Sequence, residues 1–564
     1  MTTARPWLAA YDSSIRPDLD IEDVTLSEGL SRSARNHPGA TAIRFKGRAF
    51  SYRWLDGAVS RFANGLRGLG VKPGERVAIQ LPNVPQAVIA FYGTMRAGAT
   101  AVMTNPLYTL RELEHQWADA DCKVAVTCDF TWMGTLREHR AVLRPEKYVV
   151  ASIPEYLGIP KRWLAPFVLG RQDPPRYARF PDEPGVARFK RMVDASPAGG
   201  EFGRPDFDDV AILQYTGGTT GPSKGAMLTH RNLSANVQQI DAWFVGAREA
   251  HEVMLTALPL FHVFGLTVCM NWGVWSAAEL VLEPNPRDIG SLVDAIEGAR
   301  VTLFPSVPAL FAKMCEYEGI EKRDLRSVRA CFSGSAPISP ETMRRFEELT
   351  GARVVEGFGM TETSPVTHCN PLGGERKVGS VGVPISNTGA RVVDVDTGTT
   401  DVAPGEEGEL IVRGPQVMAG YWNRPDETAQ VLRDGWMHTG DLATMDDEGF
   451  FRIVGRKKDM INVSGLKVFP DEVDHVLASH PDVLEAATIG VPREKGGEQV
   501  KSFVVLRKGS KATAETLEAF CRESLAAYKV PKEIEFLDEL PKSTIMKVLR
   551  RELRDIEMAK RKKS

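Results

Sequence analysis

Short apolar runs alternate with longer amphipathic stretches over the first 150 residues. Residues 76–81 (RVAIQL) and 123–127 (KVAVT) have the length and composition of buried strands. Residues 85–98, between them, have the length and pattern of a helix. Such alternation predicts parallel strands joined by helical crossovers. Because it resumes between residues 209 and 455, we expect one large α/β unit there.

A smaller unit is predicted from residue 456 onward. Residues 501–506 (KSFVVL) are typical of a strand and residues 514–525 of a helix. The motif-rich stretch 441–470 lies between the two units, and we interpret it as a domain junction. The last fourteen residues are rich in charge, and we expect them to fray.

Residues 151–207 interrupt the alternation with many prolines. Between residues 155 and 194 there are eight basic and five acidic side chains, a local excess of +3. The aromatic residues interleaved with them are Trp163, Phe167, Tyr177, Phe180 and Phe189. Charge attraction combined with shallow apolar insertion is how proteins dock on membrane surfaces. The alternative is a surface excursion packed on the core, so peripheral contact through residues 155–191 is left open.

Composition narrows the class of protein. Of 564 residues, 43% are hydrophobic and 25% charged, as in globular chains with a large core. Lys plus Arg number 70 against 73 Asp plus Glu, so the net charge of -3 disfavours a nucleic-acid binder. The seven cysteines are scattered without C-x-x-C spacing, which favours free thiols in a reducing compartment. No signal peptide or run of ~18 apolar residues is visible, so we expect a cytoplasmic protein.

The strongest chemical signal is the stretch 214–225 (QYTGGTTGPSKG). An apolar run at 210–213 leads into it, and a helical pattern at 233–240 follows. Glycines let a backbone approach phosphate oxygens, hydroxyl groups donate hydrogen bonds and Lys224 adds a positive charge. The P-loop pattern G-x-x-x-x-G-K-[ST] does not fit, because Ser223 precedes the lysine and glycine follows it. The loop is predicted to bind polyphosphate in another way.

Six further segments accompany this loop in a fixed order. They are 258–265 (LPLFHVFG), 333–337 (SGSAP), 356–363 (EGFGMTET), 436–441 (WMHTGD), 455–465 (GRKKDMINVSG) and 540–550 (LPKSTIMKVLR). Together the seven motifs resemble the adenylate-forming superfamily of acyl-CoA synthetases, peptide-synthetase adenylation domains and beetle luciferases. The resemblance covers nearly the whole chain. QYTGGTTG, NPRDIG and the ending LPKSTIMKVLRRELRD are most similar to bacterial long-chain fatty acid–CoA ligases.

The resemblance implies ATP, Mg²⁺ and coenzyme A as reactants or cofactors. A carboxylate attacks the α-phosphorus of ATP, so positive charge must be supplied where two anions meet. The implied phosphate loop comprises Thr216, Gly217, Gly218, Thr219, Thr220, Gly221, Ser223 and Lys224. Thr361 would contact the α-phosphate, Glu362 would hold Mg²⁺, and Lys547 would bridge the carboxylate and the α-phosphate.

The same resemblance implies the remaining site residues. The adenine slot would consist of Gly334, Ser335, Ala336, Pro337, Glu356, Gly357, Phe358 and Gly359. Asp441 and Arg456 would bind the ribose. His262 would stand beside the substrate carboxylate, with Phe261, Phe264 and Leu266 at the mouth of the acyl pocket. Lys458 would be the hinge, and Ser464 with Gly465 would face the pantetheine arm of coenzyme A.

Structural interpretations compete at several of these positions. Glu362 alone would suit the start of a helix, and Asp441 alone an ordinary turn. His262 lies between aromatic residues, as a packed core histidine would. Lys458 has the setting of a solvated lysine within a basic run. Met546 departs from the family pattern, which has glycine directly before the catalytic lysine, and this puts the efficiency of adenylation in doubt.

The expected fold is α/β, with a large N-terminal adenylate-forming domain of αβαβα-like layers and a small β-barrel subdomain. A small mobile α+β domain follows it. The expected boundaries are 1–455, a hinge at 456–458, and 459–564. The predicted function is ATP-dependent activation of a medium- or long-chain fatty acid to acyl-AMP, then thioester formation with coenzyme A. A CoA ligase for another carboxylic acid and an acyl-AMP ligase serving a carrier protein are the alternatives; a non-catalytic acyl-nucleotide regulator and a homodimer also stay open.

Overall fold

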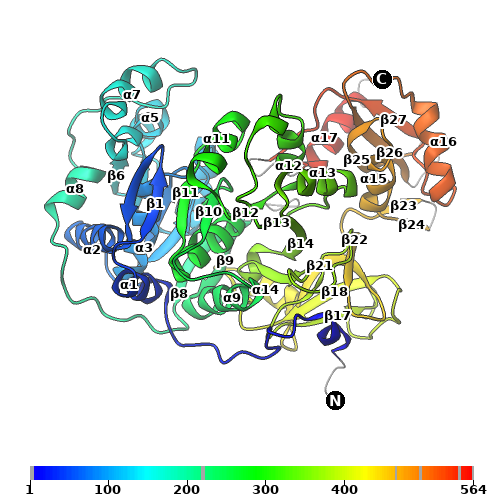
Figure 1. The fold of residues 1–564 in the computed structure, drawn as a ribbon, viewed down its shortest axis with the longest axis horizontal. Coiled ribbons are helices and arrows are strands. Elements are labelled where there is room, and N and C mark those ends of the chain that lie inside the picture. Colours follow the sequence, from blue (N-terminus) through cyan, green and yellow to red (C-terminus); the bar gives the residue numbers. More distant parts are fainter. Residues whose placement is uncertain (1–4, 217–222, 464–465, 494–497, 544–547, 562–564) are drawn as a thin grey trace.

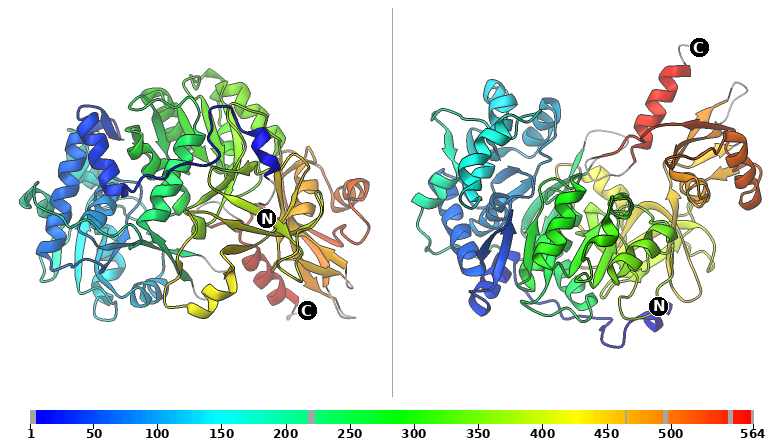
Figure 2. Two further views of the ribbon diagram at one scale, coloured as in Figure 1. Left: turned by 90° about the horizontal axis from the view of Figure 1, so that it is seen from below. Right: turned by 45° about the horizontal axis from the view of Figure 1, so that its top comes forward.

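The computed structural model describes residues 5–216, 223–463, 466–493, 498–543 and 548–561. Figure 1 shows sheets and covering helices in the larger part of the chain and a smaller group of strands and helices at the carboxyl-terminal end. Figure 2 shows that the last helix projects along the side of this smaller group. Within the described residues, none of the helices combines the length and the apolar character needed to span a bilayer.

One large sheet carries the expected strands of the first 150 residues. In spatial order it contains β19 (Gly420–Tyr421), β9 (Lys224–Thr229), β8 (Val210–Thr216), β4 (Thr100–Met103), β3 (Arg76–Gln80), β5 (Cys122–Cys128), β6 (Lys147–Ala151) and β7 (Val186–Arg188). From β8 to β7 the neighbouring strands are parallel. Their carboxyl ends therefore share one edge, and the predictions at 76–81 and 123–127 are confirmed.

A second large sheet lies beside the first. In spatial order it contains β16 (Val383–Pro384), β15 (Val366–Cys369), β14 (Arg353–Gly359), β13 (Ala330–Ser333), β12 (Leu303–Ser306), β10 (Val253–Thr256), β11 (Glu279–Leu282), β1 (Thr41–Phe45) and β2 (Arg48–Ser51). Parallel pairing runs from β14 to β1. The candidate motifs at 258, 334 and 356 follow or end strands of this sheet.

Helices cover the two sheets and also lie between them. They are α1 (Leu26–Asn36), α2 (Tyr52–Gly68), α3 (Pro85–Arg96), α4 (Leu110–Asp119), α5 (Asp129–Thr131), α6 (Arg137–His139), α7 (Lys161–Gly170), α8 (Phe189–Ala195), α9 (His230–Trp243), α10 (Trp272–Trp275), α11 (Ile289–Ala299), α12 (Pro308–Cys315), α13 (Pro340–Thr350) and α14 (Pro425–Val431). Every residue of α3 is buried, including Arg96, whose guanidinium pairs with Asp56. The Tyr92 hydroxyl of α3 donates to Asn271 of the π-helical turn η4 (Gly265–Asn271), 3.0 Å away. This bond joins α3, which follows a strand of one sheet, to a turn that follows a strand of the other.

An antiparallel sheet stands where the small β-barrel subdomain is expected. It contains β17 (Gly389–Val393), β18 (Gly408–Arg413), β20 (Leu432–Arg433), β21 (Trp436–Met445) and β22 (Phe451–Arg456). The carboxyl-terminal group contains β23 (Ile461–Val463), β24 (Leu466–Val468), β25 (Val483–Pro492), β26 (Glu498–Leu506), β27 (Glu533–Phe536), α15 (Pro470–Ala478), α16 (Ala514–Ser524) and α17 (Arg550–Arg561). The strand expected at 501–506, the helix expected at 514–525 and the α/β fold class are confirmed.

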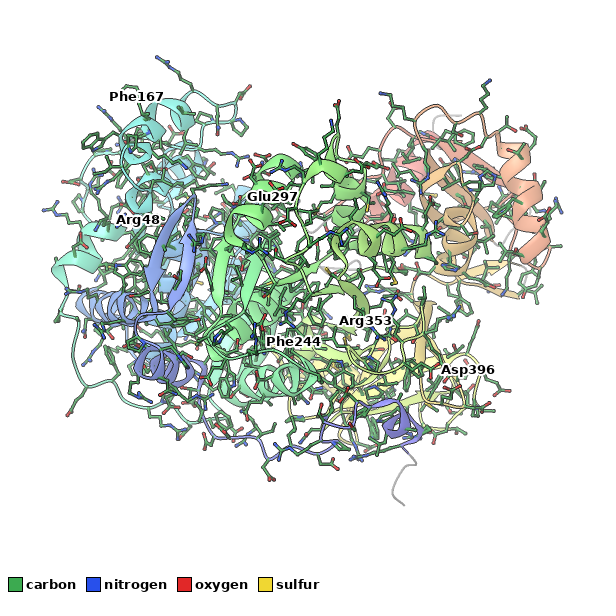
Figure 3. All side chains as sticks on the ribbon, viewed as in Figure 1. Arg48, Phe167, Phe244, Glu297, Arg353 and Asp396 are labelled. Carbon is green, nitrogen blue, oxygen red and sulfur yellow. The ribbon has the colours of Figure 1, made fainter. Side chains whose placement is uncertain are left out.

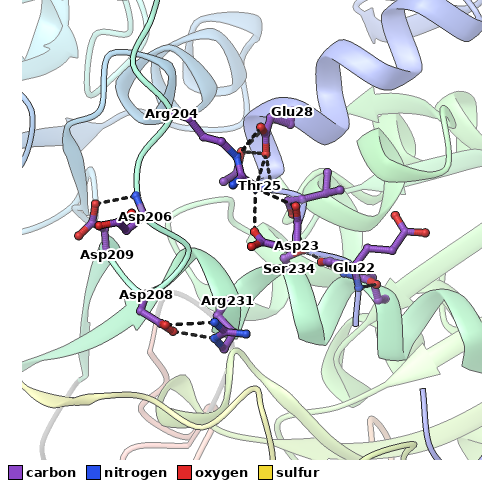
Figure 4. A network of polar contacts seen from close by, with 12 residues as sticks. Glu22, Asp23, Thr25, Glu28, Arg204, Asp206, Asp208, Asp209, Arg231 and Ser234 are labelled. Atoms are coloured by element: carbon purple, nitrogen blue, oxygen red, sulfur yellow. Dashed lines mark hydrogen bonds and ion pairs between the residues drawn. The ribbon is translucent and has the colours of Figure 1, made fainter. Parts of the chain in front are cut away.

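The connection between α8 and β8 is fixed to the N-terminal helices by ion pairs (Figure 4). Arg204 donates to Glu28 at 2.8 Å and to Asp23 at 2.7 Å. Glu28 also completes the capping box of α1 with Thr25. Arg231, at the start of α9, donates to Asp208 at 2.6 Å. The Arg204 contacts thus hold the connection against the start of α1, and the Arg231–Asp208 pair joins the two chain ends at the open end of the β8–β9 hairpin.

The tail prediction was wrong. α17 is a regular helix through Arg561, and its Glu557 is buried. Glu557 accepts from Lys501 at 2.8 Å and from Arg561 at 2.6 Å. Arg561 also pairs with Glu533 of β27. The charges that suggested a frayed end instead join the helix to the sheet, which local composition does not reveal.

Gly359 lies at a close approach of two backbone segments near the site. A Cβ atom at this position would lie 2.1 Å from the Pro365 carbonyl oxygen. Because backbone cannot yield as a side-chain end can, we expect Gly359→Ala to lower the free energy of unfolding by about 1–3 kcal/mol. Gly57→Ala is the control, since Gly57 lies in α2 with nothing within 4 Å of the added carbon. It should raise that free energy by about 0.5–1 kcal/mol in urea titrations. Equal effects of the two would contradict the packing argument.

Candidate functional site

The phosphate-binding motif lies at the end of a β-hairpin. β8 and β9 are antiparallel, and Thr216 pairs in register with Lys224. The helical pattern expected at 233–240 is confirmed, since it lies in α9, which begins at His230; β9 lies between the loop and this helix. A helix N-terminus therefore does not immediately follow the loop. Residues 217–222, which include Gly217, Gly218, Thr219, Thr220 and Gly221, lie outside the described residues.

Neighbouring helices and loops fix this hairpin next to the phosphate loop. The Tyr215 hydroxyl donates to the Asp119 carboxylate at 2.6 Å, and Arg424 pairs with the same carboxylate at 3.1 Å. His115 Nε2 lies 3.0 Å from the Ser223 carbonyl oxygen. The hairpin is thus held from two sides where the phosphate motif leaves the sheet.

Three side chains from separate elements meet beside the hairpin. The Lys224 ammonium lies 5.1 Å from the centre of the Tyr421 ring, within the range of a cation–π contact. The Tyr421 hydroxyl donates to Glu362 Oε1 at 2.8 Å. Tyr421 belongs to β19, whose pairing with β9 brings residues 421 and 226 opposite each other. Burial and then the Glu362 carboxylate raise the pKa of Tyr421, which keeps its hydroxyl a donor.

Tyr421 was not found from the sequence. Its only signal is a glycine followed by two aromatic residues, 420–422, and this pattern has no specific chemistry. The strand pairing that brings it to Glu362 is long-range, so it becomes visible only in the fold.

Glu362 is suited to hold a divalent cation together with a phosphate. Its carboxylate is buried, and Tyr421 occupies one oxygen, Oε1. Oε2 accepts no hydrogen bond from the described residues. Mg²⁺ is normally held by one or two carboxylates plus substrate phosphates. A buried carboxylate with one oxygen left to coordinate thus fits a cation shared with a bound phosphate. In the described part of the chain no three His, Cys, Asp or Glu side chains form a metal-binding group.

Thr361 begins the short 3₁₀ turn η6 (Thr361–Thr363) with Glu362, and the turn is held from both sides. The Thr363 hydroxyl lies 3.1 Å from the Met360 amide that donates to it. The Met418 amide donates to the Glu362 carbonyl oxygen at 2.8 Å. Thr361 itself is half-buried beside the carboxylate. The helix-start alternative for Glu362 describes its turn correctly but does not explain its contact with Tyr421.

The 334–337 motif follows β13, and the 356–359 motif ends β14, the adjacent parallel strand. Ser333, the last residue of β13, pairs in register with Glu356 of β14. Ser335 has a φ of 71°, in the left-handed region that non-glycine residues seldom adopt. Ser335, Ala336 and Pro337 are exposed, while Phe358 and Gly357 are half-buried. An exposed, conformationally fixed loop next to a strand end can contact a flat ligand.

Glu356 lies beneath this loop as a buried carboxylate. Burial raises the pKa of Glu356 to about 7, although the Gly379 and Ile338 amides donate to it and act in the opposite direction. The Gly379 amide nitrogen is 2.9 Å from Oε2. Glu356 thus supports the loop from inside the protein rather than facing solvent.

The aromatic motif at 258–265 contacts both the β8–β9 hairpin and the 334–337 motif. Gln214 of β8 donates to the Phe261 carbonyl oxygen at 2.8 Å. A Cβ on Gly334 would lie 3.0 Å from the Phe264 ring, so this ring packs directly on the nucleotide motif. The Phe264 amide donates to His262 Nδ1 at 3.3 Å. His262 is half-buried, and Leu266 is buried in the core behind it.

Asp441 and Arg456 face each other across β21 and β22. Arg456 Nε donates to Asp441 Oδ1 at 2.9 Å, and the Asp441 carboxylate raises the pKa of Arg456. Lys458 lies two residues after Arg456, in the turn that follows β22. Desolvation and the Arg456 charge lower the pKa of Lys458, whereas Asp441 and Glu362 oppose this effect. Lys458 is therefore close enough to both site carboxylates to interact with them electrostatically.

Lys547, Ser464 and Gly465 lie outside the described residues, and so does Met546. The chain just after Lys547 is firmly attached: Leu549 donates its amide to Pro541 at 2.8 Å. Arg550 pairs with Asp471 and Asp474 of α15. Among the described predicted residues, Lys224 and Glu362 are linked through Tyr421, Gly334 meets Phe264, and Asp441 meets Arg456.

Comparison with known proteins identifies the family. The family model described as AMP-binding enzyme matches residues 30–422, and the AMP-binding enzyme C-terminal domain matches residues 472–547. A long-chain-fatty-acid–CoA ligase of Bacillus subtilis (strain 168) is 41% identical, covering 98% of each chain. A ligase of the same description from Yersinia pestis is 40% identical over 98% of each chain. Among solved structures, the anthranilate CoA ligase AuaEII in complex with anthranoyl-AMP has a TM-score of 0.85 at 27% identity, covering 96% of this chain and 98% of its own. The chain belongs to the AMP-binding enzyme family.

Proposed function

We propose that this protein is an AMP-forming acid–thiol ligase that activates a medium- or long-chain fatty acid and transfers it to coenzyme A. The observation that carries the proposal is the full-length similarity to long-chain-fatty-acid–CoA ligases at about 40% identity. ATP, Mg²⁺ and coenzyme A are the other participants, as in the family. The described site residues suit the first half-reaction.

In that half-reaction a carboxylate oxygen of the acid bonds to the α-phosphorus of ATP. The bond from this phosphorus to the bridging oxygen breaks, and pyrophosphate leaves with the electron pair. Lys224 and the hydroxyl groups of the loop would bind the departing phosphates, and Lys547 would neutralise charge at the reacting centre. Glu362, oriented by Tyr421, would hold the Mg²⁺ that supplies further positive charge to the phosphates. Thr361 would contact the α-phosphate from the same turn.

We assign the nucleoside to the region between the 334–337 and 356–359 motifs on one side and Asp441 with Arg456 on the other. The loop 335–337 after β13 and the end of β14 would hold adenine, since both are accessible and β13 and β14 are adjacent strands. Asp441 would accept hydrogen bonds from the ribose hydroxyls, oriented by Arg456 at 2.9 Å. Phe264 packs on Gly334, so an acyl group placed beside His262 would lie next to the adenylate.

In the second half-reaction the coenzyme A thiol attacks the acyl carbon and AMP leaves. We propose domains at 1–455 and 459–564 that rotate about 456–458 between the two steps. The Asp459 amide donates to Arg456 at 3.0 Å, which closes a turn at this junction. Arg507 pairs with Glu341 and Glu316 across the domains, but these side chains are solvent-accessible, and such pairs oppose rotation little. Ser464 and Gly465 would then face the thiol arm.

A CoA ligase for another carboxylic acid is the second candidate, because AuaEII, named as an anthranilate CoA ligase, shares the fold. Pyrophosphate release should be measured across acids from C2 to C20 and aryl acids, with and without coenzyme A. We expect the highest kcat/KM for medium- or long-chain fatty acids and thioester formation that depends on coenzyme A. Preference for an aryl acid would overturn the substrate class. Pyrophosphate release without formation of a CoA thioester would favour transfer of the acyl group to a carrier protein.

Peripheral membrane contact through residues 155–191 is part of the proposal, since a long-chain acid partitions into lipid. The homodimer that the sequence leaves open stays a prediction.

A further inference from the structure

The helix α7 exposes large apolar side chains to solvent. Trp163 is 67% exposed, Phe167 63%, Leu164 60% and Val168 60%. Ile159, just before the helix, is 70% exposed. Phe167 points outward from α7 at the margin of the molecule in Figure 3. Five of the large exposed apolar residues in the described chain thus gather within ten positions.

The polarity of α7 is reversed relative to an ordinary surface helix. Trp163, Leu164, Phe167 and Val168 fall within about 140° of the helix circumference. The smaller Ala165 and the half-buried Leu169 lie on the opposite side, and Ala165 packs against the core. No residue of α7 is buried. A surface helix normally turns its apolar stripe inward, so packing within the chain does not explain this one.

Positive charge surrounds the apolar face. Lys161, Arg162, Arg171, Arg176 and Arg179 are exposed, and the one exposed acidic side chain between residues 159 and 179 is Asp173. Within the described residues no ion pair with a carboxylate is formed by Arg162, Arg171, Arg176 or Arg179.

The basic residues farther along the segment behave differently. Arg188 and Arg191 both pair with Asp182, and Lys190 pairs with Asp194. The basic charge around α7 therefore remains available to an outside partner, whereas the following charges are neutralised within the chain.

The position of α7 is fixed relative to the site. Lys161 Nζ donates to the Lys46 carbonyl oxygen at 3.1 Å, and Arg48 donates to the Leu157 carbonyl at 3.3 Å. Beneath it, Ser152 donates to the buried Asp129 carboxylate at 2.6 Å. α7 follows the carboxyl end of β6, on the same edge of the sheet where β8 leads into the phosphate loop. Four strand spacings of ~4.8 Å, or about 19 Å along the sheet, separate β6 from β8.

We propose that α7 and the basic residues between 159 and 179 dock the enzyme on an anionic phospholipid bilayer. The inference rests on the proposed function, because it supplies the fatty acid from the phase in which it is dissolved. Trp163, Phe167, Leu164 and Val168 enter the interfacial region, while the arginines bind lipid phosphates. The dimensions favour lipid over a second copy, since a stable protein interface takes about 20–30 residues from each side. This patch consists of one ten-residue helix and its flanks.

The apolar part is tested by flotation of the full-length enzyme with vesicles of phosphatidylglycerol and phosphatidylcholine. We expect Trp163→Ser/Phe167→Ser to lower the partition coefficient at least about 10-fold, because two inserted aromatic side chains are lost. Val142→Ser is the control: Val142 is 65% exposed, lies before the opposite end of β6, and should not alter binding. Binding of the double variant equal to wild type would overturn the proposal.

The charged part is tested by Arg171→Gln/Arg176→Gln against Arg35→Gln/Arg53→Gln, which changes net charge equally on α1 and α2. We expect the first pair to lower binding about 10-fold and to weaken its dependence on salt, and the second to leave both nearly unchanged. Equal losses would indicate attraction by net charge and overturn a docking face at α7. If the α7 variants lose a dimer in ultracentrifugation without lipid but keep their vesicle binding, a second copy is the occupant of this face. That result would also overturn the proposal.

Activity measurements separate this inference from the ligase assignment. With dissolved decanoate all four variants should keep wild-type kcat, whereas with vesicle-borne oleate the two α7 variants should be slower. Unchanged oleate kinetics would show that docking at α7 does not deliver substrate. Wild-type vesicle binding without any acyl-CoA formation would contradict the proposed function and leave the docking face standing.

Discussion

Lys547→Ala is expected to slow acyl-AMP formation about 10²–10³-fold and to leave thioester formation from supplied acyl-AMP nearly unchanged. The magnitude is that of removing one preorganised charge or donor from a developing anionic centre. The family resemblance assigns Lys547 to the first transition state, where charge builds on the carboxylate and the α-phosphate. The domain rotation proposed here would withdraw it before the thiol attacks. Separate assays of pyrophosphate release and of CoA consumption with synthetic acyl-AMP check the two steps.

The structure makes this variant interpretable. Arg550 is anchored to Asp471 and Asp474, and Leu549 to Pro541, so truncating one side chain before them should not release the segment. Lys508→Ala removes an exposed lysine of the same domain and should leave both half-reactions intact. Equal loss of both steps in Lys547→Ala would contradict the two-conformation mechanism. Loss of thioester formation alone would overturn the assignment of the lysine.

Glu362→Gln is expected to lower kcat/KM for ATP roughly 10–100-fold at limiting Mg²⁺, with partial recovery at high Mg²⁺. The amide keeps an oxygen that can accept from the Tyr421 hydroxyl, so the fold of the turn should persist. What is lost is the negative charge and the second oxygen, Oε2, which accepts no hydrogen bond from described residues. Titration of Mg²⁺ in the adenylation assay measures the effect.

Tyr421→Phe distinguishes holding the cation from orienting the carboxylate. It removes the 2.8 Å hydrogen bond but leaves the ring beside Lys224, so we expect a smaller loss, about 10-fold. Full adenylation by Glu362→Gln at limiting Mg²⁺ would exclude the cation role. A larger loss in Tyr421→Phe than in Glu362→Gln would make the tyrosine the more important of the two.

The sequence was sufficient where local pattern and physical constraint coincide. The strands at 76–81, 123–127 and 501–506 are apolar runs in sheets, and their burial follows from composition alone. The seven motifs identified the family because their residues and their order along the chain resemble those of adenylate-forming enzymes. The excess of positive charge and aromatic residues after residue 155 also signalled an unusual surface before any fold was known.

Only the tertiary structure decided features that depend on pairing between distant segments. Antiparallel pairing of β8 with β9 placed the phosphate motif at the end of a hairpin, which the local pattern did not indicate because strand pairing depends on two segments at once. Pairing of β19 with β9 brought Tyr421 to Glu362, and ion pairs with β26 and β27 made α17 a firm helix instead of a frayed tail. Likewise Trp163 and Phe167 could have packed inward like Phe180 and Phe189; their exposure depends on how α7 rests on the β1–β2 turn, which periodicity within ten residues does not specify.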